Sequence, residues 1–68
     1  MPIVAVSLLE GRPPEKLEAL IADLTATVVA TLDVPAASVR VILSEVPPSH
    51  WGIGGVSKLQ QRQQETNS

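Results

Sequence analysis

The spacing of apolar residues changes twice within the first 46 positions, and this pattern constrains the fold more than any other feature of the chain. Residues 2–9 are an apolar run with good β propensity, and both of its faces are mostly nonpolar, as in strands covered on both sides. Residues 39–46 predict a second strand, with Val39, Val41 and Leu43 on one face and Arg40, Ile42 and Ser44 on the other. Between these runs the period is helical, and one apolar stripe contains Leu17, Leu20, Ile21, Leu24, Val28 and Leu32.

A strand, a helix and a strand in this order predict an α+β protein with a single β-α-β unit, in which the two strands are parallel and the crossover is right-handed. The helix is expected over residues 14–32, between a Gly-Arg-Pro-Pro turn and a loop at 33–38. One helix covers one face of a sheet. We therefore expect dimerisation with a second copy to complete the sheet and cover its other face.

The last third of the chain is glycine-rich and then polar. Residues 47–50 form a rigid polar bend, and residues 51–56 contain three glycines and predict a short C-terminal hairpin arm. Their Gly-Ile-Gly-Gly run lacks the Lys-Ser/Thr pair of a phosphate-binding loop. We expect one domain over residues 1–60, and a polar, disordered tail over residues 61–68.

Chain size and composition favour an oligomer. The chain has 68 residues, of which 44% are apolar, with no cysteine and a single aromatic residue, Trp51. A domain of this length is marginally stable alone, and here neither a disulfide nor a Cys/His metal cluster can reinforce it. We expect the missing core to come from other copies of the chain.

Several partners and locations are disfavoured by the sequence. A formal net charge of −2 provides no basic patch for nucleic acid. No apolar run approaches the roughly 20 residues of a membrane span, and the N-terminus lacks the pattern of a secretion signal. We expect a soluble, cytoplasmic protein that binds neither nucleic acid nor membrane, and the absence of cysteine is compatible with this location.

Pro2 directly follows the initiator methionine. Methionine aminopeptidase removes Met1 when the next side chain is small, so the mature chain would begin with a secondary amine attached to a strand. The pKa of an α-amino group is about 7.7–8 in model peptides, and desolvation lowers it. Pro2 would then provide a neutral base near physiological pH. The alternative is that a proline at this position has no chemical role.

Two arginines are placed where an anionic ligand could bind. Arg12 follows the first predicted strand, and Arg40 lies within the second, at the end where Pro2 begins the first. The planar guanidinium binds carboxylates through two hydrogen bonds. The alternatives are a salt bridge for Arg40 and a solvated loop for Arg12. The single histidine, His50, is interpreted as a surface or turn residue, so Ser–His–Asp and Cys–His sites have little support.

Four short motifs together resemble the 4-oxalocrotonate tautomerase family over residues 2 to about 60. They are Pro-Ile at 2–3, Leu-Glu-Gly-Arg at 9–12, Ser-Val-Arg-Val-Ile at 38–42 and His-Trp-Gly-Ile-Gly-Gly at 50–55. The resemblance implies the β-α-β fold of the tautomerase superfamily and a homohexamer built as a trimer of dimers. It also implies an enzyme without metal or organic cofactor.

The resemblance also implies roles for individual residues. Pro2 matches the catalytic base, Arg40 the arginine that binds the carboxylate and carbonyl end of the substrate, and Arg12 the arginine that binds its distal carboxylate. Trp51 stands where the family more often has Phe, in a hydrophobic wall. Three further residues match positions that line the site: Leu9, Ser38 and Ile53. In the family these groups come from different subunits.

The function that the resemblance implies is an isomerase that interconverts enol and keto forms of 2-hydroxydienoate or related enol-carboxylate substrates in aromatic compound catabolism. A near-neutral base with cationic partners suits such proton transfer. One alternative is a non-catalytic partner subunit of a hetero-oligomer, with Pro2 blocked by Met1. Another is a 3-chloroacrylate dehalogenase or hydratase, which needs a carboxylate near Ile53 and a second arginine near Leu9, and the sequence has neither.

Two departures from the family pattern affect the site. Trp51 is larger than Phe and would reshape the substrate pocket. The Arg12-Pro13-Pro14 turn is stiffer than usual, which affects where the Arg12 side chain lies.

Overall fold

Two parallel strands form the centre of the fold. In the computed structural model, which describes residues 1–66, strand β1 (Ile3–Leu9) pairs with strand β2 (Arg40–Val46) along its whole length. Ile3 lies opposite Arg40, and Leu9 lies opposite Val46. Each strand begins one residue later than the sequence predicts. The predicted β-α-β unit with two parallel strands is confirmed.

Helix α1 (Pro14–Leu32) connects the strands and has the bounds that the apolar stripe predicts. It begins where a proline at the first helical position loses no hydrogen bond, and Glu15 in the first turn complements the helix dipole. It ends at Asp33, whose left-handed backbone (φ 56, ψ 52) lets its N–H donate to the Val29 carbonyl at 3.0 Å. No helix within residues 1–66 is both long and apolar enough to cross a membrane.

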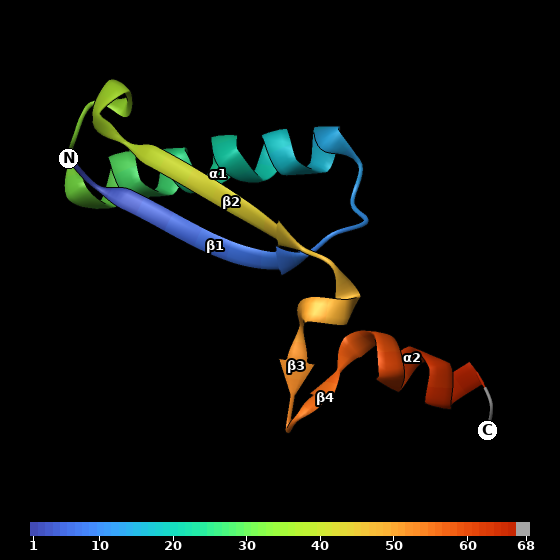
Figure 1. The fold of residues 1–68 in the computed structure, drawn as a ribbon. Helices are drawn as coiled ribbons and strands as arrows, with labels where there is room; N and C mark the ends of the chain where they lie inside the picture. The colour runs from blue at the N-terminus through green and yellow to red at the C-terminus, as the bar shows by residue number, and fades with distance from the viewer. Residues whose placement is uncertain (67–68) are drawn as a thin grey trace.

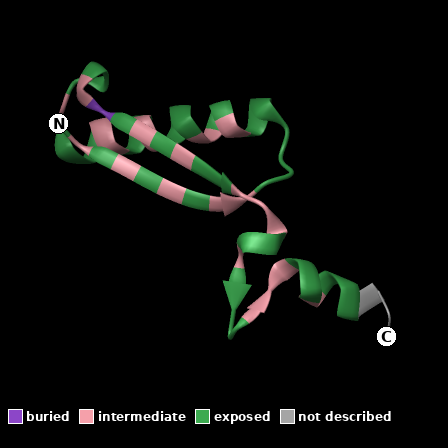
Figure 2. Cartoon of the chain, in the orientation of Figure 1, coloured by how far each residue is buried: buried purple, intermediate pink, exposed green. Residues whose placement is uncertain are grey.

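Helix α1 covers one face of the two-stranded sheet and leaves the other face open (Figure 1). Burial alternates along both strands, as Figure 2 shows. The half-buried residues of the covered face include Val6 and Leu43. On the open face, Ile3 is 64% exposed and Ile42 is 52% exposed. A single chain therefore leaves large aliphatic side chains in water.

The chain is too extended to form a complete core alone. Its radius of gyration is 16.0 Å, whereas a compact domain of this length would have about 11 Å. Its accessible surface is 4944 Å², against about 4,100 Å² for a folded monomer of this mass. Among the described residues, Val39 is the single buried apolar side chain. These values support the expectation of an oligomer.

A second unit follows β2 and lies beyond the C-terminal ends of both strands (Figure 1). Strands β3 (Gly52–Ile53) and β4 (Val56–Ser57) form the predicted hairpin arm. Gly54 and Gly55 make the two-residue turn with φ of 61° and 88°. Positive φ at both turn positions is the signature of a type I′ hairpin, whose twist matches that of its strands.

The polar C-terminal segment differs from the prediction. Helix α2 (Lys58–Thr66) occupies most of the region that we expected to be disordered. Its start is stabilised locally, because the Ser57 hydroxyl accepts the Gln60 N–H at 3.1 Å and the Lys58 N–H donates to the Trp51 carbonyl at 2.7 Å. The helix also packs on β4 and on the short 3-10 helix η2 (Pro48–His50). Residues 67–68 of the expected tail lie outside the described residues.

Substitution of Gly55 by alanine should lower the free energy of unfolding by about 1–2 kcal/mol, because an L-residue is strained at positive φ. The measurement is urea unfolding followed by Trp51 fluorescence. Gly52→Ala is the matched control: its backbone has no positive φ, and at both positions an added Cβ meets no atom within 4 Å. Equal losses in the two variants would contradict the conformational explanation.

Substitution of Ile42 by aspartate should weaken assembly, because it places a charge on the open sheet face that we expect another copy to bury. Sedimentation velocity should show a shift from oligomer to smaller species. Ala22→Asp, on the exposed side of α1, adds the same charge elsewhere and should keep the wild-type mass. An Ile42→Asp protein with unchanged mass at low micromolar concentration would disprove the role of this face.

Candidate active site

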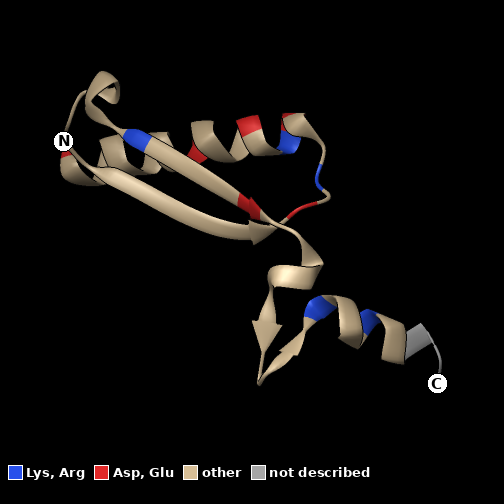
Figure 3. Ribbon diagram, in the orientation of Figure 1, with Lys and Arg blue, Asp and Glu red and all other residues tan. Residues whose placement is uncertain are grey.

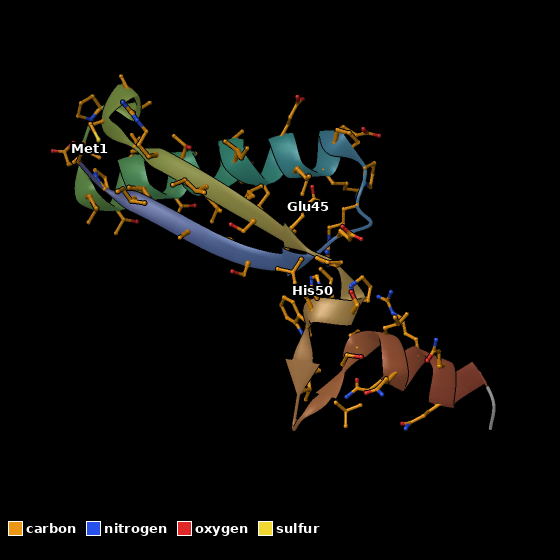
Figure 4. The ribbon with its side chains drawn as sticks, in the orientation of Figure 1. Met1, Glu45 and His50 are labelled. Atoms are coloured by element: carbon orange, nitrogen blue, oxygen red, sulfur yellow. The ribbon has the colours of Figure 1, made fainter. Side chains whose placement is uncertain are left out.

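Pro2 and Arg40 lie at the end of the sheet where both strands begin. The Arg40 backbone N–H donates to the Pro2 carbonyl at 3.0 Å and opens the parallel ladder. Pro2 is half-buried, whereas Met1 is 80% exposed at the tip of this end (Figure 4). The Pro2 nitrogen forms a peptide bond with Met1, so a basic amine exists there only after Met1 has been removed. The exposure of Met1 leaves that bond accessible to an aminopeptidase.

The Arg40 side chain is anchored by backbone carbonyls. Its Nη1 donates to the Ala37 carbonyl at 2.7 Å and, more weakly, to the Val39 carbonyl at 3.4 Å. Among residues 1–66 it forms no ion pair, so the salt-bridge alternative is not observed within one chain. The side chain is exposed, and its Nε and Nη2 donors have no partner in the described chain. This face of the guanidinium can bind an anion.

Arg12 and Leu9 lie at the opposite end of the sheet. The Arg12 Nη1 donates to the Leu9 carbonyl at 3.0 Å, which fixes an exposed guanidinium where β1 ends. From Ile3 to Leu9 the strand advances six residues, which at about 3.3 Å each amounts to about 20 Å. In Figure 3, where Lys and Arg are blue, the basic position at the start of β2 and the one in the turn before α1 accordingly lie at opposite ends of the sheet. One chain cannot bring Arg12 to Pro2.

Trp51 and Ile53 also belong to the end where the strands finish. Trp51 is half-buried, directly after η2, and Ile53 in β3 is 50% exposed. Figure 4 shows His50 and Glu45 at this end of the sheet, which is the end far from Met1. His50 is exposed, in agreement with its interpretation as a turn residue.

The seven predicted site residues therefore fall into two groups. The start group contains Pro2, Ser38 and Arg40; the end group contains Leu9, Arg12, Trp51 and Ile53. The described part of a single chain encloses no pocket and contains no cluster of metal-binding side chains. A site that uses both groups must be formed where the start group of one copy meets the end group of another.

Comparison with known proteins identifies the family. A family model described as "Tautomerase enzyme" matches residues 2–61. The chain belongs to the tautomerase family. A protein of Ralstonia nicotianae named "Probable tautomerase RSp0893" is 55% identical to this family member over 58 residues, which cover 85% of this chain and 83% of that protein. The 2-hydroxymuconate tautomerase of Stutzerimonas stutzeri is 47% identical over 57 residues, or 84% and 90% of the two chains.

Solved structures place this tautomerase in the 4-oxalocrotonate tautomerase group. A 4-oxalocrotonate tautomerase homologue of the tomaymycin biosynthetic pathway superposes with a TM-score of 0.88 at 45% identity, covering 91% of this chain and 95% of its own. A heterohexamer 4-oxalocrotonate tautomerase from Chloroflexus aurantiacus gives 0.83 at 43% identity, covering 88% and 97%. The family and fold predicted from the sequence are confirmed, and the tautomerase belongs to the isomerase class of enzymes.

Sequence reasoning missed two backbone groups that hold predicted site residues. The Ala37 carbonyl anchors Arg40, and the Lys58 N–H holds the Trp51 carbonyl. No side-chain motif reveals either group. The Pro35 to Ser38 segment did carry a local signal, because Pro and Ser favour a tight turn.

Subunits carrying different substitutions should complement each other in this tautomerase. Pro2→Ala and Arg12→Ala homo-oligomers should each have low activity. After random mixing through denaturation and refolding, about one quarter of the sites should combine an intact Pro2 from one chain with an intact Arg12 from another. Rate measurements against the mixing ratio check this. If both residues came from the same chain, no mixed site would be intact and the mixture would stay at the average of its parents.

Proposed function

We propose that the protein interconverts enol and keto forms of 2-hydroxydienoate or related enol-carboxylate substrates, with the N-terminal amine of Pro2 as the base after Met1 removal. The observation that carries the proposal is the 3.0 Å hydrogen bond from the Arg40 N–H to the Pro2 carbonyl. It brings Pro2, whose nitrogen would become the N-terminal amine, and Arg40, whose guanidinium forms no ion pair among residues 1–66, to the same end of the sheet. Relatives named 2-hydroxymuconate tautomerase support the substrate class.

The proton transfer needs these two groups and no cofactor. In the enol-to-keto direction the neutral Pro2 amine accepts the proton of the enol hydroxyl, and the negative charge that this leaves is spread over the oxygen and the conjugated carbons of the substrate. Arg40, a permanent cation, stabilises the resulting enolate charge. The protonated amine then gives its proton to a carbon of the conjugated system while the enolate oxygen becomes a carbonyl, which forms the keto product and restores the neutral base.

The end group of a neighbouring copy completes the proposed site. Arg12 binds the distal carboxylate of the substrate, and its anchor on the Leu9 carbonyl holds it at the rim. Trp51 and Ile53 form an apolar wall with Leu9. Removing water from around the amine favours its neutral form, which is the form that acts as a base. Ser38, the third member of the start group, lies beside Arg40 in the proposed site.

A homohexamer built as a trimer of dimers is the proposed assembly. The open apolar face around Ile3 and Ile42 and the division of the site residues between the two ends support association of several copies. The heterohexamer neighbour favours a second candidate, a subunit that works only with a diverged partner chain. Native mass of the chain expressed alone distinguishes them: a stable, active hexamer supports the first, and an inactive smaller species supports the second.

Conversion of Pro2 to alanine should lower kcat for ketonisation of 2-hydroxymuconate by about 100-fold or more, because the base is replaced by a primary amine in a different geometry. Arg40→Ala should lower kcat/KM by about 100-fold through lost stabilisation of charge. Ultraviolet absorbance of the dienol follows the reaction, and intact mass on the same sample establishes that Met1 is absent.

Lys16→Ala provides the control, because it removes an exposed cation on α1 outside both groups and should leave the rate unchanged. A Met1-free Pro2→Ala protein that turns over at the wild-type rate would disprove the proposed base. Wild-type protein that lacks Met1 and shows no turnover would reject this substrate class.

A further inference from the structure

Ser38 closes a short turn immediately before Arg40. The turn is the 3-10 helix η1 (Ala36–Ser38), which follows Pro35. Both the Ser38 hydroxyl and the Ser38 N–H donate to the Pro35 carbonyl, at 2.8 and 3.0 Å. The Val39 N–H adds a bond to the Ala36 carbonyl at 3.1 Å. The hydroxyl thus adds a side-chain bond to a turn that has two backbone bonds of its own.

The same turn sets the direction of the Arg40 anchor. The Ala37 carbonyl, which accepts from Arg40 Nη1 at 2.7 Å, belongs to the residue in the middle of η1. A carbonyl can direct a long side chain only if its own peptide plane is fixed. Arg40 is exposed, and its other anchor, the Val39 carbonyl, is distant at 3.4 Å. The orientation of the guanidinium therefore depends mainly on the turn.

We propose that Ser38 is a positioning residue that acts through Arg40: its hydroxyl holds the η1 turn, and the turn holds the guanidinium in the direction needed for substrate. This inference rests on the proposed function, in which Arg40 stabilises the enolate. In this role Ser38 holds the turn that orients Arg40, instead of lining the site and touching substrate as the family resemblance implies. Its only hydroxyl proton is already donated to Pro35, so it cannot also donate to a ligand without releasing the turn.

Preorganisation of Arg40 should show in the rate. A donor already aimed at the developing charge needs no reorientation during the reaction. Ser38→Ala removes one hydrogen bond of the turn and should lower kcat/KM by about two- to tenfold. Ser38→Thr keeps the hydroxyl and should recover most of this loss.

A double-mutant cycle with Arg40 tests the proposal. If Ser38 acts through Arg40, Ser38→Ala should change the activity of the Arg40→Ala enzyme by less than about twofold. The same fold loss in both backgrounds would mean that Ser38 contacts substrate directly and would overturn the proposal. Thr27→Ala is the matched control: it removes a similar bond, from the Thr27 hydroxyl to the Asp23 carbonyl at 3.0 Å, on α1 and should leave kcat/KM unchanged in both backgrounds.

Nitrogen-15 NMR of the Arg40 guanidinium gives a readout independent of turnover. In the wild type, the anchored Nη1 should be resolved from Nη2 because rotation about the Cζ–Nε bond is hindered. In Ser38→Ala the two signals should average, whereas in Ser38→Thr and Thr27→Ala they should stay separate. Unchanged hindrance in Ser38→Ala would reject the positioning role, even if the wild type failed to act on enol substrates and the proposed function were lost.

Loss of assembly in Ser38→Ala would prevent both comparisons, and size-exclusion chromatography and circular dichroism detect it. Ser38→Cys then takes its place, because it keeps the side-chain size but replaces the hydroxyl with a weak donor. Ser38→Cys should lower kcat/KM only when Arg40 is intact, and it should average the Nη1 and Nη2 signals of Arg40. An equal fold loss in both backgrounds, or unchanged hindrance of the guanidinium, would overturn the proposal.

Discussion

The rest of this structure depends on the register with which the parallel strands β1 and β2 pair. The ladder opens with the Arg40 N–H on the Pro2 carbonyl and continues to Leu9 opposite Val46. A shift of one residue would move Arg40 to the face covered by α1 and expose the apolar side chains that α1 packs against. The register therefore fixes at once which face is apolar and which end of the sheet carries the N-terminus and a cation.

That register also places the predicted site residues in two groups at opposite ends of the sheet. The strand length of about 20 Å separates Pro2 from Arg12, and the single helix leaves the face with Ile3 and Ile42 uncovered. Both facts point to the same solution, which is association of several copies. In the proposed assembly, the residues that set the strand register would also determine how the copies associate and which groups meet in the site.

The sequence predicted the β-α-β unit closely, because hydrophobic period alone defines elements that pack against one another. The bounds of α1 agree to the residue, and each strand differs by one position. Helix α2 was missed because composition describes only the polarity of a segment. The cap by Ser57 and the packing on η2 and β4 that order the helix are local and tertiary effects, which composition does not report.

The candidate site was predictable in part for a similar reason. The proximity of Pro2 and Arg40 follows from the geometry of parallel strands and is observed. The catalytic and binding roles of the seven residues remain predictions, since they rest on family resemblance. The Ala37 carbonyl that orients Arg40 was not predictable, because every residue has a carbonyl and only the fold selects which one is used.

The hydrogen bond from the Lys58 N–H to the Trp51 carbonyl has a consequence for how this tautomerase can diversify. The family model matches residues 2–61, whereas α2 continues to Thr66, so the last residues of the helix lie outside that match. The first residue of that helix holds the peptide group of Trp51, which the proposed function places in the wall of the site. A change in the length or composition of α2 can then move Trp51, and with it the wall of the proposed substrate pocket, without replacing any of the seven predicted site residues.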